Sequence, residues 1–289
     1  MNIVNWIKQL RLSLPHCMDS YQKLVEATEY LKTYTSQNPK VAIVLGSGLG
    51  NFTKEIDIVA EIEYDDIPHF PVSTVEGHHG KLIFGLMAER PVIAMAGRFH
   101  FYEGYSPEEV VFPIWVMKML GIETLLISNA AGGVHPSFKV GDLMVITDHI
   151  SFAVGNPLIG KNDGRIGARF PDMSEPYKKH LIGKVKNIAQ QLDVEIKEGV
   201  YFGVTGPTFE TRAEYKMIHL LGGDAVGMST VQEVIAAVHA GMDVFAMSVI
   251  TDIGIRQEEN EITHAEVLQA AKAAEPKLSA IFKELISTI

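Results

Sequence analysis

The stretch TLLISNAAGG, residues 124–133, decides the fold of this chain. Its first four residues form an apolar run typical of a short buried strand, and residues 128–133 are small, polar or glycine. Such residues at the carboxyl end of a strand let the backbone approach a ligand and turn its N–H groups toward an anion. Tight turns use the same residue types, so this stretch alone fits either a turn or a ligand-binding edge.

The same pattern occurs four more times, and the repetition favours a binding site. The apolar runs and the polar or glycine-rich ends that follow them are 41–45 with 46–50, 92–96 with 97–100, 200–205 with 206–210, and 244–250 with 251–252. In open α/β sheets, ligands bind just outside the carboxyl ends of the strands. The sequence therefore predicts an α/β fold with one composite site for a small, polar, anionic ligand.

Length and composition indicate one ordinary globular domain. The 289 residues, 47% hydrophobic and 21% charged, suffice for one large core, and no linker or repeat divides residues 1–289. A net charge of −10 argues against nucleic acid or an anionic membrane as the main partner. The single cysteine, Cys17, excludes an intrachain disulfide framework and fits a reducing cytosol. We expect a packing or surface thiol there rather than a nucleophile.

The N-terminal segment is expected to be a helical extension. Residues 1–20 mix apolar and basic side chains without the continuous apolar core of a signal peptide, and no run elsewhere reaches transmembrane length. We interpret residues 1–35 as an extension that docks on the body or on a neighbouring subunit. A cytoplasmic protein with no membrane partner is therefore expected.

Capping boxes predict two helices. The box at 106–109 should begin a helix that ends at Gly121, and the box at 263–266 should begin the last helix of the chain. A proline lies inside each helix. Pro113 is expected to bend the first helix, and Pro276 is expected to kink or split the second.

Two further segments lie between these helices. A helix is expected to begin near residues 229–230, with Gln232 and Glu233 as box partners, and to stop at Gly241. Residues 150–176 are rich in glycine and proline and have few periodic apolar positions. They predict a long functional loop, or lid, inside a compact domain.

The glycine-rich stretch GSGLG, residues 46–50, suggests a phosphate turn rather than a nucleotide fold. Asn51 stands where the dinucleotide fingerprint needs glycine, and the Gly-Lys-Ser/Thr of the Walker motif is absent. What remains is a strand and a turn whose backbone amides and Ser47 hydroxyl can bind one phosphate. A bare tight turn is the alternative.

The stretch GRFHFYEGY, residues 97–105, gathers polar groups on one face. If the preceding strand continues to Tyr102, alternation places Arg98, His100 and Tyr102 together, with two phenylalanines on the reverse. Arginine offers a bidentate fork for phosphate, histidine a second donor, and tyrosine a hydroxyl on a flat wall. A salt-bridged arginine and a surface histidine are the alternative, but three polar groups on one face favour binding.

Three other motifs bear on the ligand. Adjacent histidines at 78–79 point opposite ways on a strand and lack a partner motif, so we predict no metal and one histidine that assists an anion. Phe209 can stack on a heterocycle and Glu210 can accept from its N–H edge, unless the ring merely covers the core. Residues 226–229 add an apolar surface and a hydroxyl at a helix N-terminus, which favours anions.

Taken in order, these motifs resemble the purine nucleoside phosphorylases of the homotrimeric class. The matching phrases are GSGLG (46–50), GHxG (77–80), RFHxYEG (98–104), NAAGG (129–133), GPTFET (206–211) and VGMSTV (226–231). The resemblance runs from about Val41 to the C-terminus. It implies a single α/β domain around a mixed, partly barrel-like β-sheet flanked by helices, assembled as a homotrimer. It also implies reversible phosphorolysis of purine ribo- and deoxyribonucleosides by inorganic phosphate in purine salvage, without a cofactor or metal.

The resemblance also assigns the site residues. Phosphate is expected to contact Ser47, His78, Arg98, His100, the backbone at Ala130, and Ser229. The nucleoside is expected to contact Tyr102, Phe209, Glu210, Val226, Met228, Asp252 and His264. The expected catalytic residues are His100, Glu210 and Asp252. In this scheme positioning and electrostatics carry the reaction, and no protein nucleophile is needed.

Two positions depart from the family pattern. Ile166 stands where a neighbouring subunit commonly donates an aromatic residue to close the sugar site, so either Ile166 is an aliphatic lid or Phe170 substitutes. Asp252 stands where 6-oxopurine enzymes carry asparagine and methylthioadenosine phosphorylases carry aspartate. We expect inosine and guanosine to be preferred, with some tolerance of adenosine. A methylthioadenosine or adenosine phosphorylase is the alternative enzyme. A non-catalytic nucleoside-binding protein would have little reason to keep the complete phosphate set.

Overall fold

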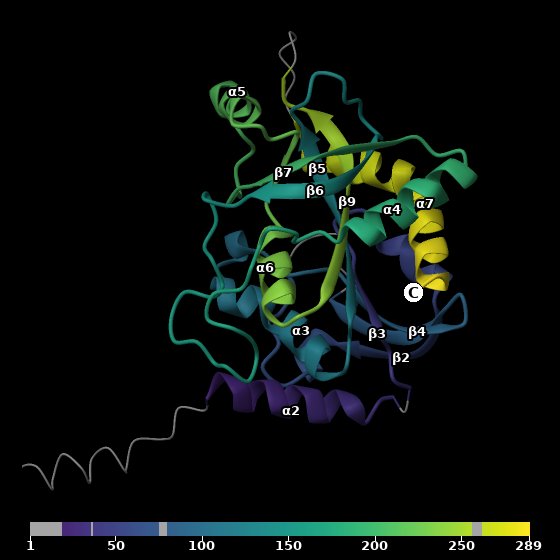
Figure 1. The fold of residues 1–289 in the computed structure, drawn as a ribbon, viewed down its shortest axis with the longest axis vertical. Helices are drawn as coiled ribbons and strands as arrows, with labels where there is room; N and C mark the ends of the chain where they lie inside the picture. Colours follow the sequence, from purple (N-terminus) through teal and green to yellow (C-terminus); the bar gives the residue numbers. More distant parts are fainter. Residues whose placement is uncertain (1–18, 36, 75–79, 256–261) are drawn as a thin grey trace, which may run out of the picture.

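The computed structural model describes residues 19–35, 37–74, 80–255 and 262–289 (Figure 1). Cys17, His78 and the first eighteen residues of the predicted extension lie outside these ranges. Within the described ranges, no helix is both long and apolar enough to cross a lipid bilayer.

The strands of the described residues form one mixed, nine-stranded sheet with a closed part. The strands are β1 (Val41–Val44), β2 (Asp57–Glu63), β3 (Lys81–Met87), β4 (Arg90–Ala96), β5 (Thr124–Gly133), β6 (Leu143–Ile150), β7 (Ile196–Gly203), β8 (Ala225–Gly227) and β9 (Asp243–Ile253). Their order is β2-β3-β4-β1-β5-β8-β7-β6-β9, and β9 pairs again with β5. Strands β5, β8, β7, β6 and β9 therefore close into a barrel, and the other four extend from β5 as an open sheet. The predicted mixed, partly barrel-like sheet is confirmed.

Strand β5 belongs to both parts and has a gap in its pairing at the middle of one edge. Its first part pairs in parallel with β1 as far as Val44 opposite Ile127, and its end pairs with β8 from Gly132 opposite Val226. Between these contacts, residues 128–131 have no strand partner on that edge within the described part of the chain. The other edge pairs with β9 along the whole strand. We call residues 128–131 the open segment of β5.

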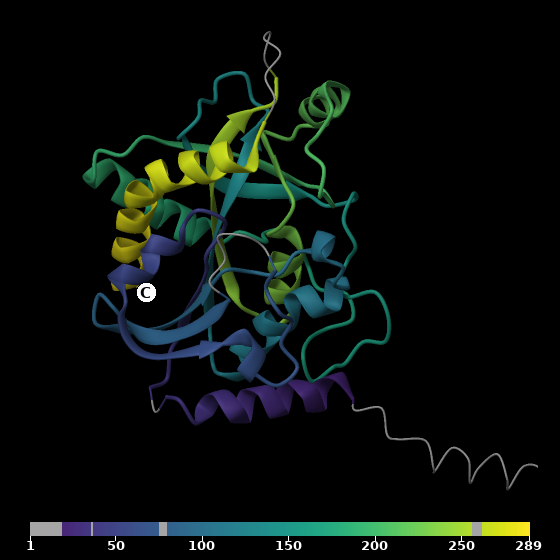
Figure 2. The same cartoon turned by 180° about the vertical axis from the view of Figure 1, so that it is seen from behind.

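Helices flank the sheet in two groups, and α5 lies apart from both (Figures 1 and 2). The helices are α2 (Ser20–Lys32), α3 (Pro107–Met119), α4 (Lys179–Gln191), α5 (Arg212–Leu220), α6 (Val231–His239) and α7 (His264–Ser287), with short 3-10 helices η1 (Gly50–Glu55), η2 (Tyr64–Asp66) and η3 (Phe101–Glu103). Helix α2 packs on α3, and α3 packs on α6. Helices α4 and α7 lie side by side, with α7 against β9. The strands between the groups form the core, and β1 is buried along its whole length.

Both predicted capping boxes form. The hydroxyl of Ser106 accepts from the backbone of Glu109 at 3.2 Å, and that of Thr263 accepts from the backbone of Glu266 at 3.3 Å. Helix α3 continues through its internal proline. Helix α7 also continues through Pro276, and Figure 2 shows it bent, so this helix is kinked without being split.

Helix α6 begins where predicted, but the prediction of a capping box at its start is wrong. Thr230, the residue before the helix, has φ 73° and makes no side-chain cap. The left-handed region is strained for a β-branched residue. Gln232 donates instead to the carbonyl of Gly155 at 2.9 Å, and Glu233 turns inward to Arg98. The expected box partners therefore make long-range contacts.

The predicted continuation of the strand to Tyr102 is wrong. Strand β4 ends at Ala96, Gly97 turns the chain with φ 108°, and η3 follows. Strand alternation therefore does not explain how Arg98 and His100 come together.

The predicted long loop is present, because residues 151–178 contain no helix or strand.

Candidate active site

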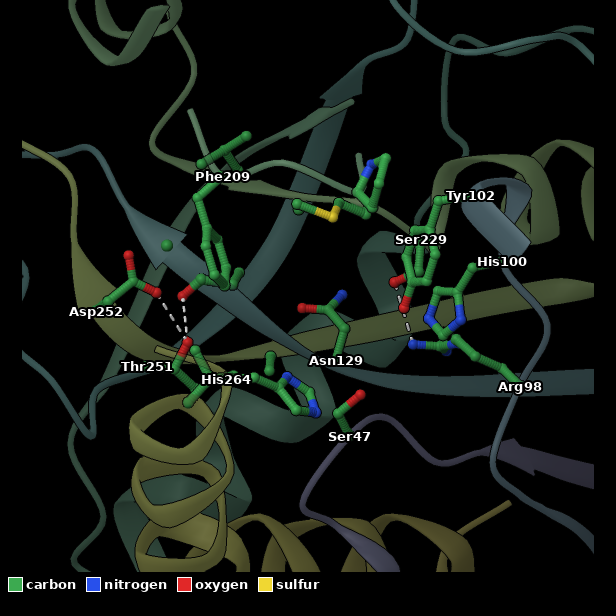
Figure 3. Close-up of a pocket in the computed structure, with 18 of the residues that line it drawn as sticks. Ser47, Arg98, His100, Tyr102, Asn129, Phe209, Ser229, Thr251, Asp252 and His264 are labelled. Carbon is green, nitrogen blue, oxygen red and sulfur yellow. Dashed lines mark hydrogen bonds between the residues drawn. The ribbon is translucent and has the colours of Figure 1, made fainter. Parts of the chain in front are cut away.

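The polar strand ends predicted from the sequence meet in one pocket of about 490 Å³ (Figure 3). The loops after β1, β4 and β7, the end of β5 and the end of β9 all contribute side chains, and the start of α7 completes the wall. Of the predicted site residues, the pocket is lined by Ser47, Arg98, His100, Tyr102, Ala130, Phe209, Glu210, Val226, Met228, Ser229, Asp252 and His264. His78 lies outside the described residues, so its assignment stays a prediction.

Arg98 lies at one side of the pocket and is held by three acceptors. Its Nε donates to Glu233 Oε1 at 3.0 Å, and its Nη1 donates to the carbonyl of Ser128 at 2.8 Å and to Ser229 Oγ at 3.3 Å. The side chain of Arg98 is only 1% exposed. The salt bridge considered as an alternative exists, but it is buried inside the pocket wall rather than on the surface.

His100 is buried beside Arg98 and is bound to Glu103. Its Nδ1 lies 3.0 Å from Glu103 Oε1, and its ring stacks on Tyr102 at 4.6 Å. Burial lowers the pKa of His100, outweighing the hydrogen bond to Glu103. Burial also acts to raise the pKa of Glu103, but hydrogen bonds from His100 and Thr74 lower it to about 2. Because a carboxylate only accepts, Nδ1 carries the proton and Nε2 keeps a lone pair.

The open segment of β5 forms the floor between the two sides of the pocket (Figure 3). Asn129 Nδ2 donates to Thr230 Oγ1 at 2.8 Å, and Thr230 Oγ1 lies 3.2 Å from Ser229 Oγ. The turn after β1 approaches closely, since a Cβ at Gly46 would lie 2.7 Å from Asn129 Cα. Only glycine permits this approach, which brings the turn that carries Ser47 to the floor of the pocket.

The other side of the pocket combines an aromatic ring with two carboxylates. Phe209 and Asp252 lie there, across Asn129 from Arg98 and His100 (Figure 3). Thr251 Oγ1 donates to Asp252 Oδ1 at 3.1 Å. Burial raises the pKa of Glu210, and the nearby charge of Asp252 raises it further. This side therefore presents acceptors and a flat apolar surface, opposite the donors of the Arg98 side.

Several residues of the site were given no individual role by the sequence, although Asn129 and Thr251 lie in the predicted strand ends. Thr74, Glu103, Asn129 and Thr251 line the pocket, and Glu233 lies directly behind Arg98. A sequence signal existed for Glu103, which follows His100 by three residues and forms a box with it. Glu233 carried only a misleading signal, that of a helix cap.

The lid residues stand apart from the pocket of their own chain. Neither Ile166 nor Phe170 is among the residues that line it, and the side chain of Phe170 is 88% exposed. In a single chain, neither residue closes this pocket.

Known proteins are similar to this chain in sequence and in fold. The model of the phosphorylase superfamily matches residues 40–287. Purine nucleoside phosphorylase 1 of Geobacillus stearothermophilus is 49% identical, covering 91% of this chain and 95% of that protein, and the rat enzyme is 45% identical, covering 93% and 96%. A Schistosoma mansoni purine nucleoside phosphorylase in complex with cytosine and ribose-1-phosphate superposes with a TM-score of 0.88 at 42% identity, covering 93% and 97%. Another, in complex with hypoxanthine, gives 0.86 at 36% identity, with the same coverage.

The motifs at the strand ends, the pocket that they line and these relatives all indicate the same family. The described motifs that resemble the family lie at the end of β5, in the loops after β1, β4 and β7, and from β8 to the start of α6. The chain belongs to the purine nucleoside phosphorylases of the phosphorylase superfamily, enzymes that reversibly cleave purine nucleosides with inorganic phosphate.

Proposed function

We propose that phosphate binds at the Arg98 side of the pocket and the purine at the Glu210 side, with C1′ of the pentose between them. The observation that carries this proposal is the separation of chemistry within one pocket (Figure 3). Donors gather at one side, and a ring with two carboxylates lies at the other. An anion matches the donors, and a heterocycle with N–H groups matches the ring and the acceptors.

The phosphate contacts follow from the donors of the first side. They are assigned to Ser47, Arg98, His100, the backbone N–H of Ala130, and Ser229, with His78 as a further contact. Arg98 and the hydroxyls donate to unprotonated oxygens. The lone pair on Nε2 of neutral His100 accepts the proton of hydrogen phosphate. An unprotonated phosphate oxygen can then attack C1′.

The reaction itself requires placement and charge stabilisation. A phosphate oxygen bonds to C1′ while the C1′–N9 bond breaks, and the bonding electron pair leaves with the purine. Positive charge develops on the sugar and negative charge on the base. From the resemblance to the family, Tyr102 and Met228 are assigned to the ribose and His264 to the 5′-hydroxyl, and each of them lines the pocket. Phe209 and Val226 are assigned to the faces of the base.

Glu210 and Asp252 are assigned to base recognition. A carboxylate accepts from N1–H of a 6-oxopurine and from the 2-amino group of guanine, whereas adenine has no N1–H. We therefore propose a preference for inosine and guanosine. Asp252 is assigned to the N7/O6 edge as an acid that protonates N7 while the bond breaks. The competing assignment is an ionised Asp252 that accepts from the 6-amino group of adenosine.

Assembly and location belong to the same proposal. We propose a homotrimer in which a neighbour's lid loop completes the site, which is consistent with the absence of Ile166 and Phe170 from the pocket of their own chain. A cytoplasmic location is proposed, since the single cysteine suits a reducing compartment.

A substrate panel tests the reaction and its specificity. Inosine, guanosine, adenosine and methylthioadenosine are assayed by ultraviolet absorbance with and without phosphate. We expect phosphate-dependent cleavage, with a higher kcat/KM for inosine and guanosine than for the 6-aminopurines. Equal rates on all four nucleosides would contradict the proposed role of Glu210.

Arg98→Ala tests the phosphate side. It removes a charge-assisted donor, so kcat/KM for phosphate should fall about ten- to a hundredfold. Arg90→Ala, which removes an exposed arginine at the start of β4, is the control and should leave phosphate use unchanged. Unchanged phosphate kinetics in Arg98→Ala would end this assignment.

A further inference from the structure

Glu233 is a buried carboxylate in the first turn of α6, outside the set of pocket-lining residues. Its side chain is 3% exposed, and its Oε1 accepts from Arg98 Nε at 3.0 Å. Its Oε2 has no hydrogen-bond partner among the described residues. A buried carboxylate with an unsatisfied oxygen destabilises a fold unless its charge is compensated. This geometry therefore calls for a role that a surface acid cannot fulfil.

The two local explanations for an acid at this position do not account for its burial. A capping box would need a side-chain cap from Thr230, and Thr230 makes none. A favourable interaction with the helix dipole is available to a solvent-exposed acid in the first turn, so it does not require the carboxylate to turn inward. The long-range contact with Arg98 is what the inward rotamer provides.

The contact with Glu233 fixes the orientation of a flexible side chain. Arg98 has several rotatable bonds, and the directions in which its N–H groups point depend on the plane of the guanidinium. Nη1 is held by Ser128 and Ser229, and Nε is held by Glu233. Bonds to Nε and Nη1 together fix the plane, and neither alone does so.

We propose that Glu233 is a positioning residue for the phosphate step, holding the guanidinium of Arg98 in the plane that receives phosphate. Ser229 and Glu233 lie at the same end of α6, so this helix end supplies one proposed phosphate contact directly and orients a second through Glu233. The inference rests on the proposed phosphate role of Arg98.

Two conservative variants separate position from charge. Glu233→Asp keeps the charge but withdraws the carboxylate by one methylene, whereas Glu233→Gln keeps an oxygen at the place of Oε1 and removes the charge. Phosphate and inosine are varied separately in steady-state assays. We expect Glu233→Asp to raise KM for phosphate about tenfold or more, with KM for inosine changed less than about threefold. Glu233→Gln should retain most of the phosphate affinity.

A second buried carboxylate serves as the matched control. Glu275 is 4% exposed and accepts from Asn51 Nδ2 and from the backbone N–H of Phe52. Glu275→Asp should lower the melting temperature without changing KM for phosphate. The double variant Arg98→Ala/Glu233→Asp should have the phosphate KM of Arg98→Ala alone, because Glu233 acts through Arg98.

The outcomes distinguish the positioning role of Glu233 from the proposed phosphate role of Arg98. If Arg98→Ala leaves phosphate kinetics unchanged, the phosphate role of Arg98 fails. If Arg98→Ala impairs phosphate use but Glu233→Asp does not, only the positioning role fails. Glu233→Gln being worse than Glu233→Asp would identify a purely electrostatic role and overturn the inference, as would equal losses for phosphate and inosine. Calorimetric titration with inorganic phosphate gives the same comparison for variants that fold but do not turn over.

Discussion

Glu103 and Glu210 line the same pocket, and their surroundings drive their pKa values in opposite directions. Burial acts to raise the pKa of each carboxyl. Glu103 gains hydrogen bonds from His100 and Thr74 that reverse the effect, whereas Glu210 faces the like charge of Asp252, which adds to it. Hydrogen bonds outweigh burial at Glu103, whereas at Glu210 burial outweighs the hydrogen bonds from its own backbone N–H and from Tyr215.

The pKa of Glu103 predicts an acid-sensitive contribution to stability. The folded-state pKa of about 2 lies below the ordinary value of 4.5, so ionised Glu103 stabilises the fold above pH 4.5. That contribution is lost as the pH falls from about 4.5 toward 2. In Glu103→Gln it should be absent, so the difference in unfolding free energy from the wild type should shrink over this range. Denaturant unfolding at pH 7, 5, 4 and 3 measures it; a difference independent of pH would contradict the prediction.

Asp252→Asn decides between the two roles proposed for this carboxyl. If Asp252 is an acid for N7, the variant should show a flatter pH–rate profile on inosine, because its amide does not titrate. If ionised Asp252 accepts from a 6-amino group, adenosine cleavage should fall about tenfold or more while inosine cleavage improves. Rate profiles on both nucleosides from pH 5 to 9 distinguish these results. No change in either substrate would remove Asp252 from base recognition.

At the scale of elements, two helix starts carry the same cap but different neighbours. The boxes of α3 and α7 are alike in residue type and geometry. Only α7 begins with a residue that lines the pocket, His264. A cap on α7 therefore serves the stability of the helix and the placement of this side chain together.

Thr263→Ala and Ser106→Ala form a matched pair that tests this difference. Each should lower the free energy of unfolding by about 1 kcal/mol, because each removes an N-cap. Only Thr263→Ala should raise KM for inosine, about two- to tenfold, by letting the first turn with His264 fray. The KM for 5′-deoxyinosine, which lacks the hydroxyl assigned to His264, should not change in either variant. Equal effects of both variants on inosine KM would show that the cap of α7 has no special role.

The elements also show why the sequence predicted some features and missed others. The boxes at 106–109 and 263–266 depend on contacts three residues apart, which a sequence pattern contains. Glu233 is an acid at the same spacing from Thr230, but its side chain pairs with Arg98, 135 residues away in the sequence. No local pattern encodes that choice. The prediction that the strand continues beyond Ala96 was wrong for a related reason. Gly97 permits a turn that the alternation of residues does not reveal. The pocket was still predicted, because the residues at the ends of β5 and β9 and after β1, β4 and β7 line it together, although β7 runs antiparallel to β5.

At the scale of the whole molecule, the lid loop carries exposed apolar side chains. Phe152 is 71% exposed, Ile159 81% and Phe170 88%, all within the loop after β6. Large apolar side chains that a single chain leaves exposed are candidates for a contact with another chain. This feature supports the proposed trimer with a lid shared between subunits.

Analytical ultracentrifugation tests the assembly. We expect a species of three times the 31.8 kDa chain mass, and Phe170→Glu should shift it toward the monomer with a loss of activity. Gln191→Glu, which adds a charge at an exposed polar residue at the end of α4, is the control. An active wild-type monomer would remove the shared lid from the proposal. Hydrogen exchange with and without ligand should show protection of residues 156–170.

The closure of the barrel through β5 and β9 also sets the order of events during biosynthesis. These strands pair over their whole length although their partners are about 120 residues apart in sequence. The open sheet, by contrast, can form when β1 to β5 have been translated. The side of the pocket that includes Asp252, and the α6 contacts with Arg98, do not exist until β6 to β9 have left the ribosome. A nascent chain released before β9 therefore contains the turn that carries Ser47 but no complete substrate site.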